Sequence, residues 1–159
     1  MSIAKEIAPH LPYLRRFARA LSGTQTSGDA YVVAMLEALP EPPAGLVLAS
    51  PSNPTGTIID PAGLAAIAAW CEANGTLLVS DEIYHGVSFG RRCASAWETS
   101  RQAALVGSFS KYFSMTGWRV GWLVLPPHLV RPVELLLGNL NICAPAVAQA
   151  AALGALTPE

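Results

Sequence analysis

The sequence has few charged residues and almost no net charge. Of its 159 residues only 13% are Asp, Glu, Lys or Arg, and the formal net charge is −1. So small a charge gives no overall electrostatic case for a nucleic-acid or acidic-membrane partner. No apolar run approaches the roughly 18 residues that a membrane-spanning helix needs. Lys5 and Glu6 stand where a signal peptide needs its apolar core, so we expect a protein that is not exported.

The sequence also lacks the cysteine and histidine patterns of disulfide-rich or zinc-binding proteins. Its three cysteines, Cys71, Cys93 and Cys143, are odd in number and far apart, which favours reduced thiols in the cytoplasm. The three histidines, at positions 10, 85 and 128, have no spacing typical of metal ligands. We therefore predict a cytoplasmic protein without a metal site.

Apolar residues, by contrast, are plentiful. They make up 52% of the sequence, which also contains 13 glycines and 13 prolines. The length suits one domain with a core of modest size. An apolar excess of this kind is typical of a parallel sheet covered by helices, or of a piece of a larger protein.

Residues 1–39 are predicted to form two or three short helices. Apolar stripes with helical spacing run from Leu11 to Leu21 and from Val32 to Leu39, as expected for amphipathic helices. Residues 40–45 contain three prolines, which favour an extended chain. We interpret residues 40–45 as a Pro-rich joint between the helical segment and the rest of the chain, residues 46–159.

Beyond this joint, predicted strands alternate with predicted helices. Short apolar runs predict strands at residues 46–50, 76–80, 103–108 and 118–125. Helices are predicted between the first two strands and, after the last, at residues 128–140 and 145–156. This alternation predicts an α/β fold with a mostly parallel sheet and flanking helices.

The first of these helices has clear local signals at both ends. Asp60 is a suitable N-cap, Pro61 suits the first helical position, and Asn74-Gly75 would end the helix. Its inward side is predicted to consist of Leu64, Ile67, Ala68 and Cys71.

Polar side chains follow three of the predicted strands. Asn53 comes after the first strand, Asp81 and Tyr84 after the second, and Lys111 after the third. Ligands bind at the carboxyl ends of strands in open α/β sheets, so we expect these side chains to meet at one edge. A lysine there can form a Schiff base, and nearby hydroxyls with a guanidinium such as that of Arg119 can hold a phosphate. Pyridoxal phosphate needs both features.

Each of these residues also has a simpler interpretation when it is taken alone. Asn53 and the proline after it are typical of a turn, and Asp81 could cap a helix. A single lysine such as Lys111, or an arginine such as Arg119, is usually an exposed surface charge. The spacing of Ser108 and Lys111 also fits the serine β-lactamase motif, but the companion motifs of that family are missing.

Residues 44–157 resemble the central part of a fold-type I, pyridoxal-phosphate-dependent aminotransferase of class I/II. Four motifs, in the order of that family, carry the resemblance: Ser52-Asn53-Pro54-Thr55-Gly56, Asp81-Glu82-Ile83-Tyr84, Ser108-Phe109-Ser110-Lys111 and Thr116-Gly117-Trp118-Arg119-Val120-Gly121. By this resemblance the chain contains part of the transferase large domain.

The resemblance also implies a role for each site residue. Lys111 would be the catalytic lysine that forms a Schiff base with the cofactor, and Asp81 would pair with the pyridine nitrogen. Asn53 and Tyr84 would donate to the phenolic oxygen of the ring. The phosphate would be bound by the remaining three residues, which are Ser108, Ser110 and Arg119.

Residues 1–39 show a second resemblance, to the start of the sigma-factor-like domain of general-stress response regulators. The motifs that carry it are residues 7–21 and Gly28-Asp29-Ala30-Tyr31. It implies that this segment binds an anti-sigma protein.

The function expected from these observations is transamination between an amino acid and a 2-oxo acid, with pyridoxal 5′-phosphate as cofactor. The resemblance implies a homodimer for the full-length family, and the short chain leads us to expect a truncated or fused product with impaired activity. Two alternatives stay open. One is a non-catalytic protein that binds an anti-sigma factor through residues 1–39, and the other is a pyridoxal-phosphate-dependent β-lyase.

Overall fold

The computed structural model describes residues 32–157. The predicted helix over residues 11–21, and most of the segment expected to bind an anti-sigma protein, lie outside the described residues. A short helix covers residues 32–37. Within the described residues, no helix is both long and apolar enough to cross a membrane.

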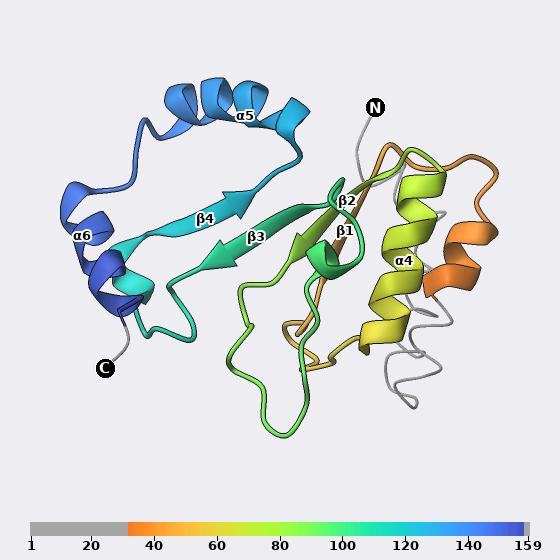
Figure 1. The fold of residues 1–159 in the computed structure, drawn as a ribbon, viewed down its shortest axis with the longest axis horizontal. Coiled ribbons are helices and arrows are strands. Elements are labelled where there is room, and N and C mark those ends of the chain that lie inside the picture. The colour runs from red at the N-terminus through yellow and green to blue at the C-terminus, as the bar shows by residue number, and fades with distance from the viewer. Residues whose placement is uncertain (1–31, 158–159) are drawn as a thin grey trace, which may run out of the picture.

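A four-stranded sheet forms the centre of the structure (Figure 1). Its strands are β1 (Gly45–Ala49), β2 (Leu77–Asp81), β3 (Ala104–Ser108) and β4 (Gly121–Val124). They lie in the order β1-β2-β3-β4. The first three strands are parallel, and β4 is antiparallel to β3. The prediction of an α/β fold with a mostly parallel sheet is therefore confirmed.

The predicted start of the fourth strand is wrong. Residues Thr116–Trp118 form a 3₁₀ turn, and Arg119 follows with a left-handed backbone, φ 53°. A residue in that conformation cannot continue a pleated strand, so the strand begins two residues later, at Gly121.

Helix α4 (Pro61–Ala73) confirms its predicted ends and its predicted inward side. The Asp60 carboxylate accepts a 2.7 Å hydrogen bond from the backbone N–H of Gly63, which caps the helix. The helix ends at Asn74, and Gly75 then takes a positive φ of 67°, which glycine adopts at little cost. All four side chains predicted to face inward are buried, namely Leu64, Ile67, Ala68 and Cys71.

The main core lies between α4, the helix over residues 32–37 and the sheet. Val32 and Leu36 are buried in the same cluster as Ile67 of α4, Leu78 of β2 and Leu105 of β3. Leu39, which was predicted to belong to the same apolar face as Val32 and Leu36, is instead 41% exposed. The helix ends at residue 37, so the chain has already turned away at Leu39.

Two more helices follow β4, at the end of the sheet away from α4 (Figure 1). They are α5 (Pro127–Leu140) and α6 (Ala146–Ala155), and their bounds agree with the predictions to within a residue. A second apolar cluster joins Ala152 of α6 to Phe109 and Met115, which lie in the loop after β3. Helix α5 has no buried residue.

The segment between β2 and β3 contains no α-helix. Its only helical piece is the 3₁₀ turn Ala96–Glu98, which has a capping box. In this box the Ser95 hydroxyl accepts from the Trp97 N–H, and the Glu98 carboxylate accepts from the Ser95 N–H. This segment and the loop after β1 lie next to the polar ends of the strands.

Candidate functional site

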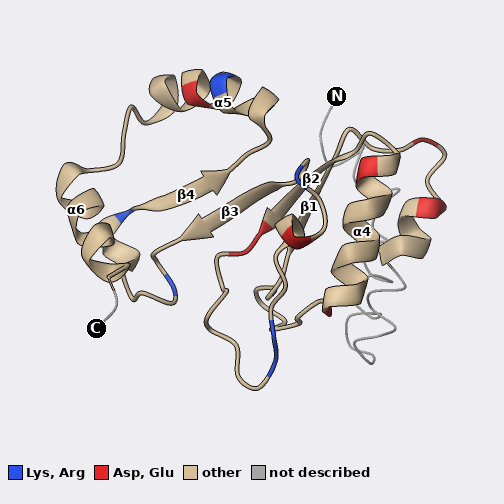
Figure 2. Cartoon of the chain, in the orientation of Figure 1, with Lys and Arg blue, Asp and Glu red and all other residues tan. Residues whose placement is uncertain are grey.

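The carboxyl ends of the parallel strands lie at one edge of the sheet. Ala49, the last residue of β1, pairs with Asp81, the last residue of β2, and Asp81 pairs with Val106 of β3. Figure 2 shows acidic residues at the end of β2 and a basic residue in the loop after β3, both at this edge. The predicted convergence of the strand ends is thus present in the fold.

Three of the predicted site residues, each from a different loop, come together here. The Asn53 side-chain N–H donates a 3.1 Å hydrogen bond to the hydroxyl of Tyr84. The Lys111 ammonium lies over the ring of Tyr84, 5.4 Å from its centroid, a distance at which a cation is attracted to an aromatic face. The Lys111 amine, the Tyr84 phenol and the Asn53 amide therefore lie next to one another at this edge of the sheet.

Buried neighbours fix the loop that carries Lys111. Phe109 and Met115 are buried on either side of it, against α6. The backbone N–H of Met115 donates to the Phe109 carbonyl at 3.1 Å, and the Thr116 hydroxyl donates to the Ser110 carbonyl at 2.7 Å. These bonds close the loop on itself, while Lys111 stays partly exposed at its tip.

A close contact between two loops brings Lys111 to Tyr84. Gly86 has a positive φ of 87°, and a Cβ atom at this position would overlap the ring of Tyr112. Tyr112 is the residue after Lys111, and Gly86 is two residues after Tyr84. In this arrangement only glycine lets the backbone at position 86 lie so close to the Tyr112 ring.

The predicted phosphate-binding residues lie at the end of β3 and just before β4. The Ser108 hydroxyl accepts a 3.0 Å hydrogen bond from the Ser110 N–H, and Ser108 pairs with Gly121 across the two strands. The exposed Arg119 guanidinium donates to the Thr116 carbonyl at 2.9 Å. No hydrogen bond or ion pair joins Arg119 to Ser108, Ser110 or Lys111, all of which the structure describes.

Asp81 has one engaged oxygen and one free oxygen. Its Oδ1 accepts a 3.2 Å hydrogen bond from the backbone N–H of Ile83, so it stabilises the turn that follows β2, but no helix begins there. Within residues 32–157, Oδ2 has no hydrogen-bond or ion-pair partner. The carboxylate can therefore accept one further N–H.

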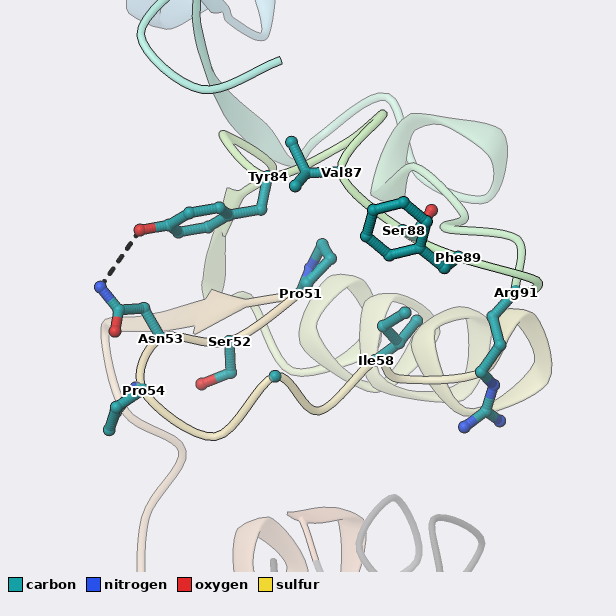
Figure 3. Close-up of a pocket in the computed structure, with 11 residues that line it drawn as sticks. Pro51, Ser52, Asn53, Pro54, Ile58, Tyr84, Val87, Ser88, Phe89 and Arg91 are labelled. Atoms are coloured by element: carbon teal, nitrogen blue, oxygen red, sulfur yellow. Dashed lines mark hydrogen bonds between the residues drawn. The ribbon is translucent and has the colours of Figure 1, made fainter. Parts of the chain in front are cut away.

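A pocket of about 470 Å³ adjoins this edge. Figure 3 shows it between the loop after β1 and the segment after β2, with the hydrogen bond between Asn53 and Tyr84 at one side. Pro51, Ile58 and Phe89 contribute apolar surface to its lining. Asn53 and Tyr84 line the pocket, but Lys111 and Asp81 do not. The pocket therefore adjoins the candidate site and does not contain all of it.

Two residues had no role in the hypothesis based on sequence. Glu82 was part of a motif without a function of its own, and His85 was one of three histidines without ligand spacing. In the structure the His85 ring contacts both the Glu82 carboxylate and the carbonyl of Ser50. The only local signal was the spacing of three residues between Glu82 and His85, because the other contacts join distant parts of the sequence.

The described residues contain no cluster suited to a metal ion. No group of three or more His, Cys, Asp or Glu side chains within residues 32–157 has such an arrangement. Among the three free cysteines only Cys71 is fully buried, and the burial raises the pKa of its thiol.

Comparison with known sequences gives one family. The family model described as "Aminotransferase class I and II" matches residues 22–159. The chain is 53% identical over 127 residues to a valine–pyruvate aminotransferase of Mycobacterium tuberculosis, a match that covers 79% of this chain and 33% of that protein. It is 34% identical over 154 residues to a (5-formylfuran-3-yl)methyl phosphate transaminase of Methanocaldococcus jannaschii, covering 95% and 40% of the two chains.

Solved structures agree with the sequence matches. A crystal structure of an aminotransferase from Mycobacterium tuberculosis has a TM-score of 0.76 and 52% identity, covering 79% of this chain and 33% of that one. A putative aminotransferase from Silicibacter pomeroyi has a TM-score of 0.66 and 50% identity, covering 70% and 30%. The chain therefore spans about a third of the length of these relatives.

The family match starts inside the segment predicted to resemble a sigma-like domain. It includes residues 22–39 and the Pro-rich joint over residues 40–45. The three predicted divisions of the chain, 1–39, 40–45 and 46–159, stay a prediction. The same holds for the anti-sigma partner, which none of the relatives named above supports.

Proposed function

Because this chain belongs to the class I and II aminotransferases, we propose that it binds pyridoxal 5′-phosphate at the carboxyl edge of its sheet. The proposed reaction is the transfer of an amino group between an amino acid and a 2-oxo acid. The chain covers about a third of its relatives, so we assign to it the part of the active site that holds the cofactor.

The observation that carries this proposal is the grouping of Lys111, Tyr84 and Asn53. Pyridoxal phosphate has an aldehyde and a phenolic oxygen on neighbouring ring carbons, so a protein that binds it needs an amine beside a hydrogen-bond donor. The amine of Lys111 lies 5.4 Å from the centre of the Tyr84 ring. The Tyr84 hydroxyl accepts from Asn53 and so keeps its own hydrogen to donate. The residues present fit the cofactor.

Asp81 supports the same assignment from the neighbouring strand. Its Oδ2 has no partner within the described residues, whereas Oδ1 is held by the N–H of Ile83. A carboxylate fixed in this way can hold a proton on a pyridine nitrogen, because the negative charge favours the protonated ring. When bound, pyridoxal phosphate supplies an electron sink for the electrons left when a bond to the substrate Cα breaks.

Lys111 has two tasks in this proposal. At rest its amine would be the group that holds the cofactor through its aldehyde, with water as the leaving product. When free, the same amine would act as the general base that takes the proton from the substrate Cα and would then give that proton up as a general acid. The buried residues Phe109 and Met115 keep this amine at the tip of a fixed loop, which limits the cost of orienting it.

Ser108, Ser110 and Arg119 are proposed to hold the phosphate. The Ser108 hydroxyl accepts from the Ser110 N–H and can donate its own hydrogen to a phosphate oxygen. Arg119 uses Nη1 for the Thr116 carbonyl and has further N–H groups for an anion. Arg119 has a left-handed backbone, φ 53°, and lies two residues before the start of β4.

Covalent labelling of lysines tests the proposal, because the chain has only two of them. Lys5 and Lys111 are the only lysines of the chain. The protein is incubated with pyridoxal phosphate, reduced with borohydride and mapped by peptide mass spectrometry. We expect the cofactor on Lys111, loss of this label in Lys111→Ala, and an unchanged label in the control Lys5→Ala. Equal labelling of Lys5 and Lys111 in the unmutated chain would show that no specific site exists.

The substrate can be narrowed by comparison. The M. tuberculosis relative, 53% identical, is named as a valine–pyruvate aminotransferase, so valine and pyruvate are the first donor and acceptor to test. Its name and that of the M. jannaschii relative favour transamination over the β-lyase alternative. The proposal includes a cytoplasmic location and a homodimer, and light scattering of the purified chain would test the homodimer.

A further inference from the structure

The Glu82 carboxylate is held by an unusual number of donors. Its Oε1 accepts from the Ser80 hydroxyl at 3.0 Å, the Ser95 hydroxyl at 3.2 Å and the Ala96 N–H at 2.9 Å. The side chain is only 10% exposed. Three donors on one oxygen fix the position of this carboxylate.

Glu82 faces away from the proposed cofactor. The backbone N–H of Glu82 continues the strand pairing by donating to the Val106 carbonyl at 3.0 Å, so Asp81 and Glu82 point to opposite faces of the sheet. Ser80, which is two residues from Glu82 and on the same face, is buried at 2% exposure. Glu82 can therefore affect the site only through other residues.

His85 connects Glu82 to the loop after β1. Its Nδ1 lies 3.6 Å from Glu82 Oε2, and its Nε2 lies 3.1 Å from the Ser50 carbonyl oxygen. A carbonyl oxygen only accepts hydrogen bonds, so Nε2 carries the hydrogen. Ser50 is itself buried, and its N–H donates to the Asp81 carbonyl while its hydroxyl accepts from the Ile59 N–H.

The two segments joined by His85 are the ones that carry Asn53 and Tyr84. Asn53 lies three residues after Ser50, in a loop closed by hydrogen bonds between Ser52 and residues 56 and 57. Tyr84 lies between Glu82 and His85, in a turn where the His85 N–H donates to the Glu82 carbonyl at 2.9 Å. The contact of His85 with Ser50 therefore bridges the segment that bears Asn53 and the turn that bears Tyr84.

We propose that Glu82 and His85 are positioning residues, which hold the Asn53 loop against the Tyr84 turn before the cofactor binds. This inference rests on the proposed function, because Asn53 and Tyr84 are proposed cofactor-binding residues. The Glu82–His85 pair would preorganise the hydrogen bond between them. The inference assigns no contact with the cofactor to Glu82 or His85.

The test measures the full chain in two ways. The first is the dissociation constant of pyridoxal phosphate by absorbance titration. The second, in the cofactor-free chain, is amide hydrogen exchange of residues 50–57. The variants are Glu82→Gln, His85→Ala and His85→Gln, because glutamine keeps an N–H that can reach the Ser50 carbonyl. The matched control is Glu72→Gln, which removes a carboxylate that also accepts from a serine hydroxyl, that of Ser100.

We expect Glu82→Gln and His85→Ala to weaken pyridoxal phosphate binding about tenfold, by analogy with the lower end of the effect of losing a group that orients a metal ligand. Exchange of residues 50–57 should become faster, while the unfolding midpoint stays near that of Glu72→Gln. His85→Gln should restore part of both properties.

Two results would overturn the inference. One is exchange of residues 50–57 that is the same in His85→Ala, His85→Gln and the control. The other is weaker binding that merely follows a lower unfolding midpoint, without rescue by glutamine. If the unmutated chain fails to attach pyridoxal phosphate at Lys111, the proposed function is wrong, but the exchange data still decide whether His85 holds the two segments together.

Discussion

Gly86 is the residue on which the approach of Lys111 to Tyr84 depends. Both Gly86 and Gly90 have a positive φ, 87° and 70°, but only at Gly86 would a Cβ atom meet another side chain, the ring of Tyr112. Substitutions at Gly86 and Gly90 therefore separate two contributions to the free energy of unfolding. Both positions report backbone strain, and only Gly86 also reports displacement of the Lys111 loop.

We predict that Gly90→Ala lowers the free energy of unfolding by about 1 kcal/mol, the cost of a left-handed non-glycine residue. Gly86→Ala should cost more and should also weaken pyridoxal phosphate binding, because Tyr112 has to move. Urea unfolding and a cofactor titration of both variants check this. Equal binding by the two variants would contradict the role given to the contact between Gly86 and Tyr112.

The thiols offer a second prediction for single residues. Burial raises the pKa of the Cys71 thiol, so less of the reactive thiolate exists at a given pH, and the side chain is also shielded. Cys143 is exposed. We expect a thiol reagent at mildly alkaline pH to label Cys143 quickly and Cys71 only after denaturant is added. Similar native rates for the two thiols, measured by peptide mass spectrometry, would contradict the burial of Cys71.

Single residues also show what the sequence could predict of the site. The residues Asn53, Asp81, Tyr84 and Lys111 were predicted because each follows a strand, and the order of strands along the chain places them at one edge. The contribution of His85 could not be predicted, since its partner Ser50 is 35 residues away and only the register of β1 with β2 brings it near.

At the scale of elements, α4 depends on its N-cap. The Asp60 carboxylate accepts from the Gly63 N–H at 2.7 Å. We predict that Asp60→Ala lowers the free energy of unfolding by about 1 kcal/mol, whereas Asp60→Asn, which keeps an oxygen acceptor, stays close to the unmutated chain. Urea unfolding of both variants tests this. An equal loss of unfolding free energy in the two would mean that the charge of Asp60, and not its capping hydrogen bond, stabilises α4.

Because of the 3₁₀ turn before β3, we expect the free energy of unfolding to fall at acidic pH. The pKa of Glu98 is lowered by the hydrogen bond from the Ser95 N–H and then by Arg92. A carboxyl group with a lowered folded-state pKa stabilises the fold above its unfolded-state pKa and loses this contribution as the pH falls. We expect the loss below the ordinary pKa of 4.5.

The variant Glu98→Gln makes this dependence measurable. Its free energy of unfolding should fall less than that of the unmutated chain when the pH is lowered through this range. Parallel pH profiles of the two proteins would contradict the assignment to Glu98.

The elements were predicted where their signals are local. The limits of α4 follow from Asp60, Pro61 and Asn74-Gly75, all of which act on their own backbone. The start of β4 was missed because Trp118 and Val120 look like strand residues, while the left-handed backbone of Arg119 depends on the turn around it. The segment between β2 and β3, for which no helix was predicted, contains only the 3₁₀ turn Ala96–Glu98.

At the scale of the whole molecule, one part of the described surface is apolar without being covered. Helix α5 has no buried residue, and Leu135, Leu136 and Leu140 are 51%, 56% and 71% exposed. This chain matches only 33% of the length of the M. tuberculosis relative, so the comparable face in that protein has more chain available to cover it.

This exposure predicts that polar substitutions of the α5 leucines will be tolerated. Changing Leu135, Leu136 or Leu140 to Gln should alter the free energy of unfolding of this chain by less than about 0.5 kcal/mol, as for ordinary surface substitutions. The control Ile67→Ala, at a side chain with 0% exposure, should cost about 2–5 kcal/mol. A large loss in the α5 variants would show that α5 is covered in solution, and sedimentation analysis would then tell whether a second copy covers it.

The reversal of direction at β4 has a consequence for how the site is built. A fourth parallel strand would have required a crossover of a dozen or more residues, with its own helix, before the chain came back to the sheet. Because β4 instead runs antiparallel to β3, the connection over residues 109–120 returns directly to the sheet without a crossover helix, and it bears both Lys111 and Arg119. The Lys111 amine that would bond to the cofactor and the Arg119 guanidinium that would hold its phosphate therefore lie eight positions apart in one connection. An insertion between them would change their spacing relative to a single ligand.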